Sequence, residues 1–132
     1  MTKWDDTPEG IIAELDEDLA AGGEDAILRR SFGTQQIPVD VSVRVHLRGY
    51  DPSELVGLIT QQDQKFIMSP TQIDQAQWPG ATVPQAPPPN DKRVPKLNDT
   101  LVTTRGKLAV QAAAGIYVRD VLVRIEGRAR GQ

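Results

Sequence analysis

The sequence predicts a mainly β fold, a small antiparallel β-barrel or sandwich with one N-terminal α-helix and a long proline-rich loop. Two long segments, 37–48 and 116–130, alternate apolar and polar residues with the period of half-buried strands. Short connections between the sequential strands of 100–130 favour an antiparallel meander. With 132 residues, the chain is expected to form a single domain, 1–132, around one core.

The N-terminal helix is predicted over residues 8–21. Thr7 followed by Pro8 provides an N-cap and a proline at the first helical position, and Gly22-Gly23 provides a stop. The apolar residues of this segment form one stripe: Ile11, Ile12, Leu15 and Leu19. The acids occupy the remaining positions: Glu14, Asp16, Glu17 and Asp18. One face should therefore dock on the domain, and the other should be strongly acidic.

A β-body is expected over about 25–78 and 98–130. In 37–48, valine or leucine at every second position predicts a long strand, with 25–31 as its hairpin partner or, as an alternative, a short helix at 26–30. Residues 55–60 and 65–68 predict a second hairpin, closed by the polar residues 61–64. Three more strands are expected at 100–104, 107–113 and 116–130, with a tight turn at 105–106.

The last predicted strand is amphipathic like the first long one. Val121, Val123, Ile125 and Ala129 alternate with charged residues. The apolar residues of 39–47 and 121–129 are therefore expected to share one core.

A long exposed loop is predicted over 79–97. Residues 79–95 contain six prolines and almost nothing that could enter a core. Just before it, 71–77 could form one helical turn, capped by Thr71. Loops of this length inside a compact domain are usually functional or become ordered on binding, so we expect this one to be mobile in the free protein.

Charge is distributed unevenly along the chain. Residues 1–28 carry nine acids against Lys3, whereas the remaining 104 residues carry fourteen Lys and Arg against nine acids. Such a dipolar chain could pair head to tail with copies of itself, although both charged regions could also be ordinary solvated surfaces.

Several classes of function are disfavoured by composition. The chain has no cysteine, and His46 is its single histidine, so thiolate chemistry and multi-histidine metal sites are excluded. No phosphate-binding loop, dinucleotide fingerprint or nucleophile elbow occurs. No apolar run is long enough to span a membrane, and the N-terminus does not resemble a signal peptide. We expect a soluble, non-enzymatic protein without a cofactor.

Two groups of cations are candidates for contact with nucleic acid or a partner. Lys92, Arg93 and Lys96 cluster at the end of the proline-rich loop, and Arg124, Arg128 and Arg130 lie on one face of the last strand. Trp78 could be a partner anchor or a core residue that closes the base of the loop. The aromatic residues are too scattered to predict a stacking platform for single strands.

Local sequence patterns resemble a known family. Residues 48–59 read RGYDPSELVGLI, residues 67–71 read IMSPT, Trp78-Pro79 and Asn98-Asp99-Thr100 follow, and the terminal strand ends in Arg-Gly. Over most of 29–130 the chain is similar to the head-closure proteins, also called stoppers or head-to-tail connectors, of tailed bacteriophages, prophages and gene transfer agents.

The resemblance implies a structural protein of the virion neck, made in the bacterial host cytoplasm. Six or twelve copies would form a ring beneath the portal or its adaptor, close the DNA exit channel after packaging and offer a surface to the tail terminator or tail tube. The loop cations Lys92, Arg93 and Lys96 would then face the channel and make non-specific contact with packaged double-stranded DNA.

The acids Glu14, Asp16, Glu17 and Asp18, together with Arg124, Arg128, Arg130 and Trp78, would belong to assembly interfaces. Alternatives are a tail terminator or another neck protein and, in a different class, a small barrel that binds single-stranded nucleic acid or a ligand.

Overall fold

The computed structural model describes residues 7–32, 34–49, 63–78, 91, 93–104 and 106–131. The predicted strand 55–60, most of the predicted loop 79–97, and Lys92 lie outside these residues. In chain order the elements are α1 (Pro8–Gly22), β1 (Glu24–Phe32), β2 (Ile37–Gly49), β3 (Asp63–Met68), α2 (Thr71–Ala76), β4 (Thr100–Thr103), β5 (Gly106–Val118) and β6 (Val121–Gly131).

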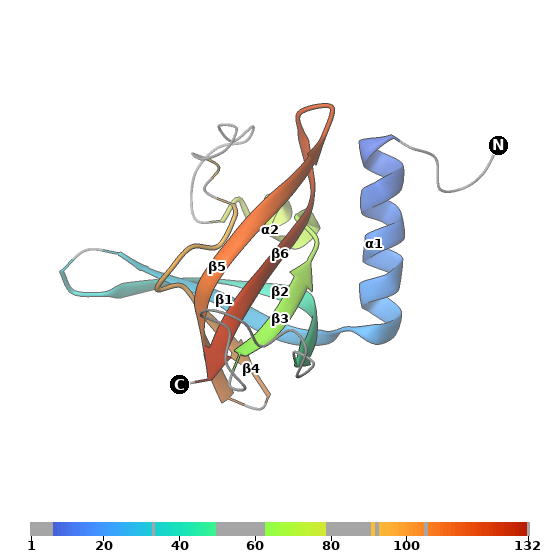
Figure 1. Ribbon diagram of the computed structural model, residues 1–132. Coiled ribbons are helices and arrows are strands. Elements are labelled where there is room, and N and C mark those ends of the chain that lie inside the picture. Colours follow the sequence, from blue (N-terminus) through green and yellow to red (C-terminus); the bar gives the residue numbers. More distant parts are fainter. Residues whose placement is uncertain are drawn as a thin grey trace.

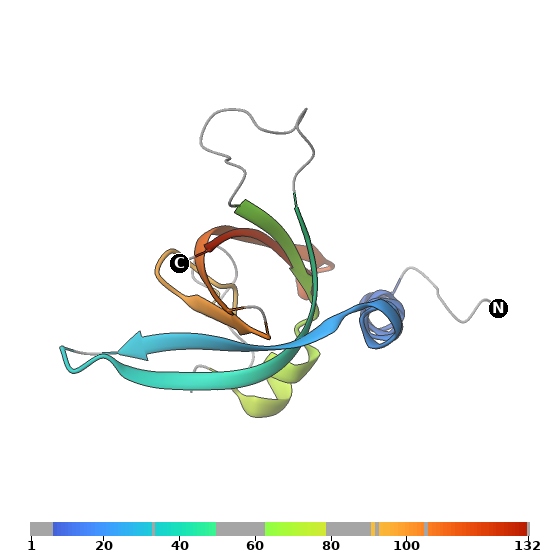
Figure 2. The same cartoon turned by 90° about the horizontal axis from the view of Figure 1, so that it is seen from below.

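The six strands form a closed antiparallel barrel in the order β1-β2-β3-β6-β5-β4 (Figures 1 and 2). This confirms the predicted fold class and decides for the barrel over the sandwich. It also decides between the alternatives for 25–31, because β1 pairs with β2 along its whole length, from Glu24 opposite Val45 to Phe32 opposite Ile37. Among the described residues, no helix is long and apolar enough to cross a membrane.

The barrel interior is filled with apolar side chains. The core takes Val41, Val43 and Val45 from β2, in the alternation that the sequence predicts. The remaining buried members come from the other strands, from α2 and from the second residue after it: Ala26, Leu28, Phe66, Met68, Ile73, Trp78, Leu101, Leu108, Val110, Leu122, Ile125 and Ala129. At about 25 cal/mol per Å² of apolar area, their burial is the main stabilising contribution to the fold.

Helix α1 lies outside the barrel and contacts β6 and β2 (Figure 1). The Thr7 side chain accepts a hydrogen bond from the Gly10 amide at 3.1 Å, which confirms the predicted N-cap. Leu15, Leu19 and Val123 are buried outside the barrel core. They belong to α1 and β6, so the helix docks on a small apolar patch of its own.

The predicted single core of 39–47 and 121–129 is therefore wrong in one part. The β5–β6 register shifts, so that Tyr117 faces Leu122 while Ile116 faces Arg124, and Val123 is the extra residue of a β-bulge. Leu122 takes the interior position, Val121 is exposed and Val123 is buried outside the barrel core. A bulge reverses the alternation locally, and the period of the sequence does not reveal it.

The predicted break between 113 and 116 is also wrong, because β5 continues to Val118 and the hairpin turns at Arg119 and Asp120, both with positive φ. Gly115 packs closely against its neighbours, since a Cβ there would lie 2.7 Å from Leu122 Cδ1. Both edges of β3 are occupied, by β2 and β6, and the expected hairpin partner, 55–60, lies outside the described residues. Thr71 begins α2 without capping it, and its amide donates to Ser69 Oγ.

Candidate functional site

The two ends of the segment 79–90 are fixed to the barrel by buried side chains. At the first end, Trp78 is buried, and its Nε1 donates to the Val39 carbonyl at 2.9 Å. The guanidinium of Arg30 lies 4.5 Å from the centre of the Trp78 ring and pairs with Asp99, Nη2 to Oδ2 at 2.7 Å. Trp78 is therefore a core residue at the base of the segment, the second of the two alternatives, and is not a surface anchor.

At the second end, Asp91 is buried beneath three donors. It accepts from the Arg93 guanidinium at 2.9 Å, from the Arg93 amide at 3.0 Å and from the Tyr117 hydroxyl at 2.6 Å. Burial by itself raises the pKa of Asp91, but these hydrogen bonds outweigh it and hold the pKa below its usual value. Burial, and then the bond to Asp91, raise the pKa of the Tyr117 hydroxyl.

This network corrects the interpretation of the loop cations. Arg93 also pairs with Asp74 of α2 at 3.0 Å, so its charge is used inside the fold. Residues 93–97, expected in an extended loop, include buried Pro95, and the half-buried Val94 packs against the core. Lys92 lies outside the described residues, and Lys96 is exposed. Of the three predicted channel cations, the described part of the structure leaves only Lys96 available to a partner.

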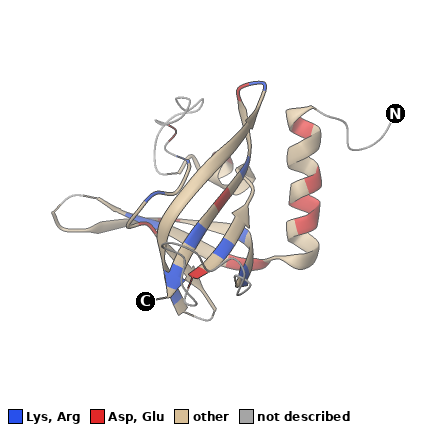
Figure 3. Ribbon diagram, viewed as in Figure 1, with Lys and Arg blue, Asp and Glu red and all other residues tan. Residues whose placement is uncertain are grey.

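A row of cations crosses the outer surface of the barrel over β2, β3 and β6. The strand register places Arg48 opposite Lys65, and Lys65 opposite Arg128. Arg130 lies at the next outward position of β6, opposite Asp63. We call Arg48, Lys65, Arg128 and Arg130 the basic strip; Figure 3 shows Lys and Arg gathered on these neighbouring strands.

Asp63 is the counterion within the basic strip. Its fully buried side chain pairs with Arg128 Nη1 at 2.9 Å and with Arg130 Nε at 2.6 Å. One carboxylate thus serves two guanidinium groups. Arg128 and Arg130 were predictable from the sequence, whereas Arg48 and Lys65 were not, because only the barrel register brings these three strands together.

Arg124, the third predicted cation of β6, is neutralised locally. Its Nη2 lies 2.9 Å from Oε1 of Glu126, two positions along the same strand. It contributes little net charge to the basic strip.

The exposed face of α1 carries the opposite charge. Glu14, Glu17 and Asp18 are exposed, and we call these three residues the acidic row. Asp16, predicted with them, is half-buried and accepts from the Thr71 hydroxyl at 2.6 Å, so it faces α2. The structure therefore separates Asp16 from the three acids that a partner could reach.

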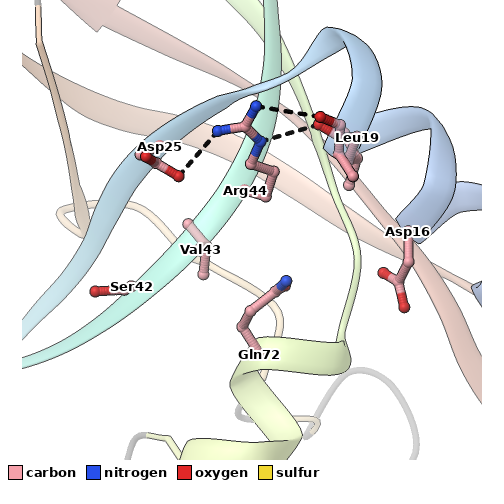
Figure 4. A pocket seen from close by; sticks show the side chains of 8 residues that line it. Asp16, Leu19, Asp25, Ser42, Val43, Arg44 and Gln72 are labelled. Carbon is pink, nitrogen blue, oxygen red and sulfur yellow. Dashed lines mark hydrogen bonds and ion pairs between the residues drawn. The ribbon is translucent and has the colours of Figure 1, made fainter.

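Arg44 fixes the C-terminal end of α1 to the barrel. Its Nε donates to the Leu19 carbonyl at 3.0 Å, and its Nη1 pairs with Asp25 at 3.0 Å (Figure 4). A cation at the helix C-terminus offsets the acids that precede it. Beside it, an open pocket of about 360 Å³ lies between α1, α2 and β2 and is lined in part by Asp16, Gln72 and Arg44.

Apolar side chains are exposed on two projecting hairpins. The β1–β2 hairpin extends well beyond the barrel, and Phe32 and Ile37, which face each other near its end, are 42% and 57% exposed (Figure 2). The β5–β6 hairpin carries exposed Ile116 and Val121 beside its turn. Exposed apolar groups on projecting elements are typical of contact surfaces for other proteins.

No family model, no curated protein and no solved structure matches this chain. Among the described residues, no three His, Asp or Glu side chains are grouped in a way that could hold a metal ion.

Proposed function

We propose that this chain is a structural protein of the neck of a tailed phage or a related particle. Copies of it would form a ring beneath the portal or its adaptor, close the DNA exit channel after packaging and provide the docking surface for the tail. The particular role comes from the resemblance of residues 48–59, 67–71 and 78–79 to head-closure proteins.

The observation that carries an assembly role is the projecting β1–β2 hairpin. Beyond Arg29, β1 no longer pairs with β4, and before Val45, β2 does not pair with β3. Arg30 and Val39 still contact Asp99 and Trp78, and past them the exposed residues 31–32 and 37–38 extend beyond the barrel. Leaving Phe32 and Ile37 in water there forgoes the stabilisation that burial would provide. An arm of this kind is suited to insertion against a neighbouring subunit.

The remaining features support a binding role over a catalytic one. The barrel interior is occupied by core side chains, and the buried ion pairs of Arg30, Arg93 and Asp63 join elements of the fold. The anchored residues Trp78 and Asp91 would allow the segment between them to act at the channel while the barrel remains folded. Lys96 is exposed, and in this proposal it would make non-specific contact with DNA.

A tail terminator or another neck protein would use the same features, so it remains the second candidate. Binding of single-stranded nucleic acid is less well supported. Phe66 and Trp78 are buried and Tyr117 is bonded to Asp91, so among the described aromatic residues only Phe32 is well exposed. Stacking platforms need several exposed aromatic side chains on one face.

The test is inactivation of the gene in a strain that produces the particles. DNA-filled heads without tails, whose DNA becomes accessible to nuclease, are the expected result; normal tailed particles would refute the proposal. Complementation with the double variant Phe32→Ser/Ile37→Ser should fail to restore DNA retention. The matched control Leu97→Ser removes an equally exposed apolar side chain, outside the β1–β2 hairpin, and should restore it.

A further inference from the structure

The pocket between α1, α2 and β2 is bordered by two side-chain oxygens that lack a hydrogen-bond donor. Asp16 Oδ1 and Gln72 Oε1 are both buried, and neither has a hydrogen-bond partner among the described residues. Asp16 lines the pocket from α1 and Gln72 lines it from α2 (Figure 4). A buried acceptor without a donor destabilises the folded state, because water no longer solvates it. A ligand that brings its own donors would remove this cost.

The carboxylate of Asp16 is already oriented for such a ligand. Its other oxygen, Oδ2, accepts from the Thr71 hydroxyl at 2.6 Å. This hydrogen bond joins α1 to the first residue of α2, so it fixes the direction of the carboxylate beside the pocket. A binding group that is held in place before the ligand arrives loses little entropy on binding.

The charges around the pocket favour a cation. Asp16 and Asp25 line it together with one guanidinium, that of Arg44. Arg44 and Asp25 pair with each other at 3.0 Å, and Arg44 also donates to the Leu19 carbonyl at 3.0 Å. This leaves Asp16 as the carboxylate at the pocket without an ion pair in the described part of the chain. An anion placed there would be repelled by Asp16, whereas a cation would be attracted.

An organic ammonium group fits this pocket better than a metal ion does. Hard metal ions take six or more oxygen ligands, and the described residues hold no group of three acidic or histidine side chains that could bind one. An ammonium group has three N–H donors and no acceptor, which suits two oxygens that both need a donor. Leu19, Ala20 and Val43 supply an apolar part of the lining for the methylene groups next to the nitrogen. The volume of about 360 Å³ lies within the range of roughly 300–1,000 Å³ that small-molecule sites occupy.

We propose that this pocket binds a primary alkylammonium group, with Asp16 Oδ1 as its ion-pair partner and Gln72 Oε1 as a second acceptor. Because both oxygens are closed to water in the free protein, the Gln72 side chain must change rotamer to admit the nitrogen, which it can do while the backbone of α2 stays in place. The same group occurs in free aliphatic amines and at the end of a lysine side chain. The inference concerns the chemistry of the ligand and does not depend on a role in a phage neck.

The test is a titration of the isotope-labelled full chain with n-butylammonium chloride at neutral pH, followed by the NMR shifts of the backbone amides. We expect saturable shifts for residues 16–20, 42–44 and 71–73, which surround the pocket. Butanol has the same alkyl chain without the charge, and sodium butyrate carries the opposite charge. Neither should produce these shifts, because neither combines a positive charge with three donors.

Two variants and one control assign the binding to the pocket. Asp16→Asn keeps an acceptor for Thr71 and removes the charge, so it should weaken binding of n-butylammonium at least about tenfold. Gln72→Met keeps the length of the side chain and removes its oxygen, so it should also weaken binding, and it serves as the test if Asp16→Asn does not fold. The matched control Asp18→Asn removes an exposed acid of α1 outside the pocket lining and should bind like the wild type.

A parallel titration with Nα-acetyl-lysine methylamide distinguishes the two sources of the ammonium group. Affinity at least about tenfold above that for n-butylammonium would assign the pocket to a lysine side chain of another protein, and equal or lower affinity would assign it to a free amine. Three results would overturn the proposal: no saturable shifts with n-butylammonium, the same shifts with butyrate or butanol, or unchanged affinity in both Asp16→Asn and Gln72→Met. Gene inactivation tests the neck role separately, so either proposal can fail without the other.

Discussion

Replacing Asp99 by alanine should show how strongly the buried pair at the base of the 79–90 segment supports the fold. The side chains of Arg30 and Asp99 are 6% and 3% exposed. Arg30 donates to Asp99 through Nε at 3.0 Å and Nη2 at 2.7 Å, and the Lys96 amide donates to the same carboxylate at 2.9 Å. Asp99→Ala removes the carboxylate that accepts these hydrogen bonds, while the Val94 carbonyl and the Trp78 ring stay beside the buried guanidinium.

Removing one partner of a buried pair costs about 3–5 kcal/mol, because the other charge stays uncompensated in a poorly solvated site. That is a large share of the roughly 5–15 kcal/mol by which small domains are stable. With a urea slope of about 2 kcal/mol/M, the unfolding midpoint should fall by about 2 M. Circular dichroism and the fluorescence of buried Trp78 would both follow the transition.

The neighbouring pair provides a matched control. Arg29 and Asp40 form the same kind of bidentate bond on the hairpin surface, with side chains that are 31% and 39% exposed. Asp40→Ala should hardly move the midpoint, because exposed ion pairs contribute little. Equal midpoints for Asp99→Ala and Asp40→Ala would refute the reasoning. The double change Arg30→Met/Asp99→Leu should recover part of the loss, since it leaves no unpaired charge.

Three further predictions test the site and the core. The pKa of Asp91 is depressed in the folded state. Its contribution to stability is therefore present above the unfolded pKa of about 4 and is lost as pH falls through the folded pKa. Asp91→Asn should flatten the acid limb of a series of thermal melts. A steeper limb would contradict this. Gly127→Ala places a Cβ 2.4 Å from Phe66 Cζ and 2.6 Å from a backbone oxygen. The free energy of unfolding measured in urea should fall by about 1–3 kcal/mol. Gly131→Ala, with open space around it, should be neutral. Val43→Asp buries a carboxylate in the barrel core and should unfold the domain. Val121→Asp, at an exposed position, should remain soluble and unfold cooperatively. A folded Val43→Asp variant would refute the core assignment.

Features that depend on neighbours in the chain were predictable from the sequence. The cap at Thr7, the helix that follows it and the alternation of Val41, Val43 and Val45 are local patterns with one physical solution each. Such patterns predicted the mainly β fold class and the strand assignments of β2, β3 and β4, whereas they leave β1 open between a strand and a short helix. Unequal charge along the chain likewise predicted an acidic helix beside a basic body.

What the tertiary structure decided depends on contacts between residues far apart in the chain. The bulge at Val123, the turn at Arg119 and the tight packing of Gly115 follow from how β5 and β6 pair, and no local pattern marks them. Arg93 and Asp16 looked like surface charges, and only their burial beside Asp91 and Thr71 showed that they join parts of the fold. The basic strip exists because three strands from distant segments lie side by side in the barrel, a register that the amphipathic period alone cannot specify.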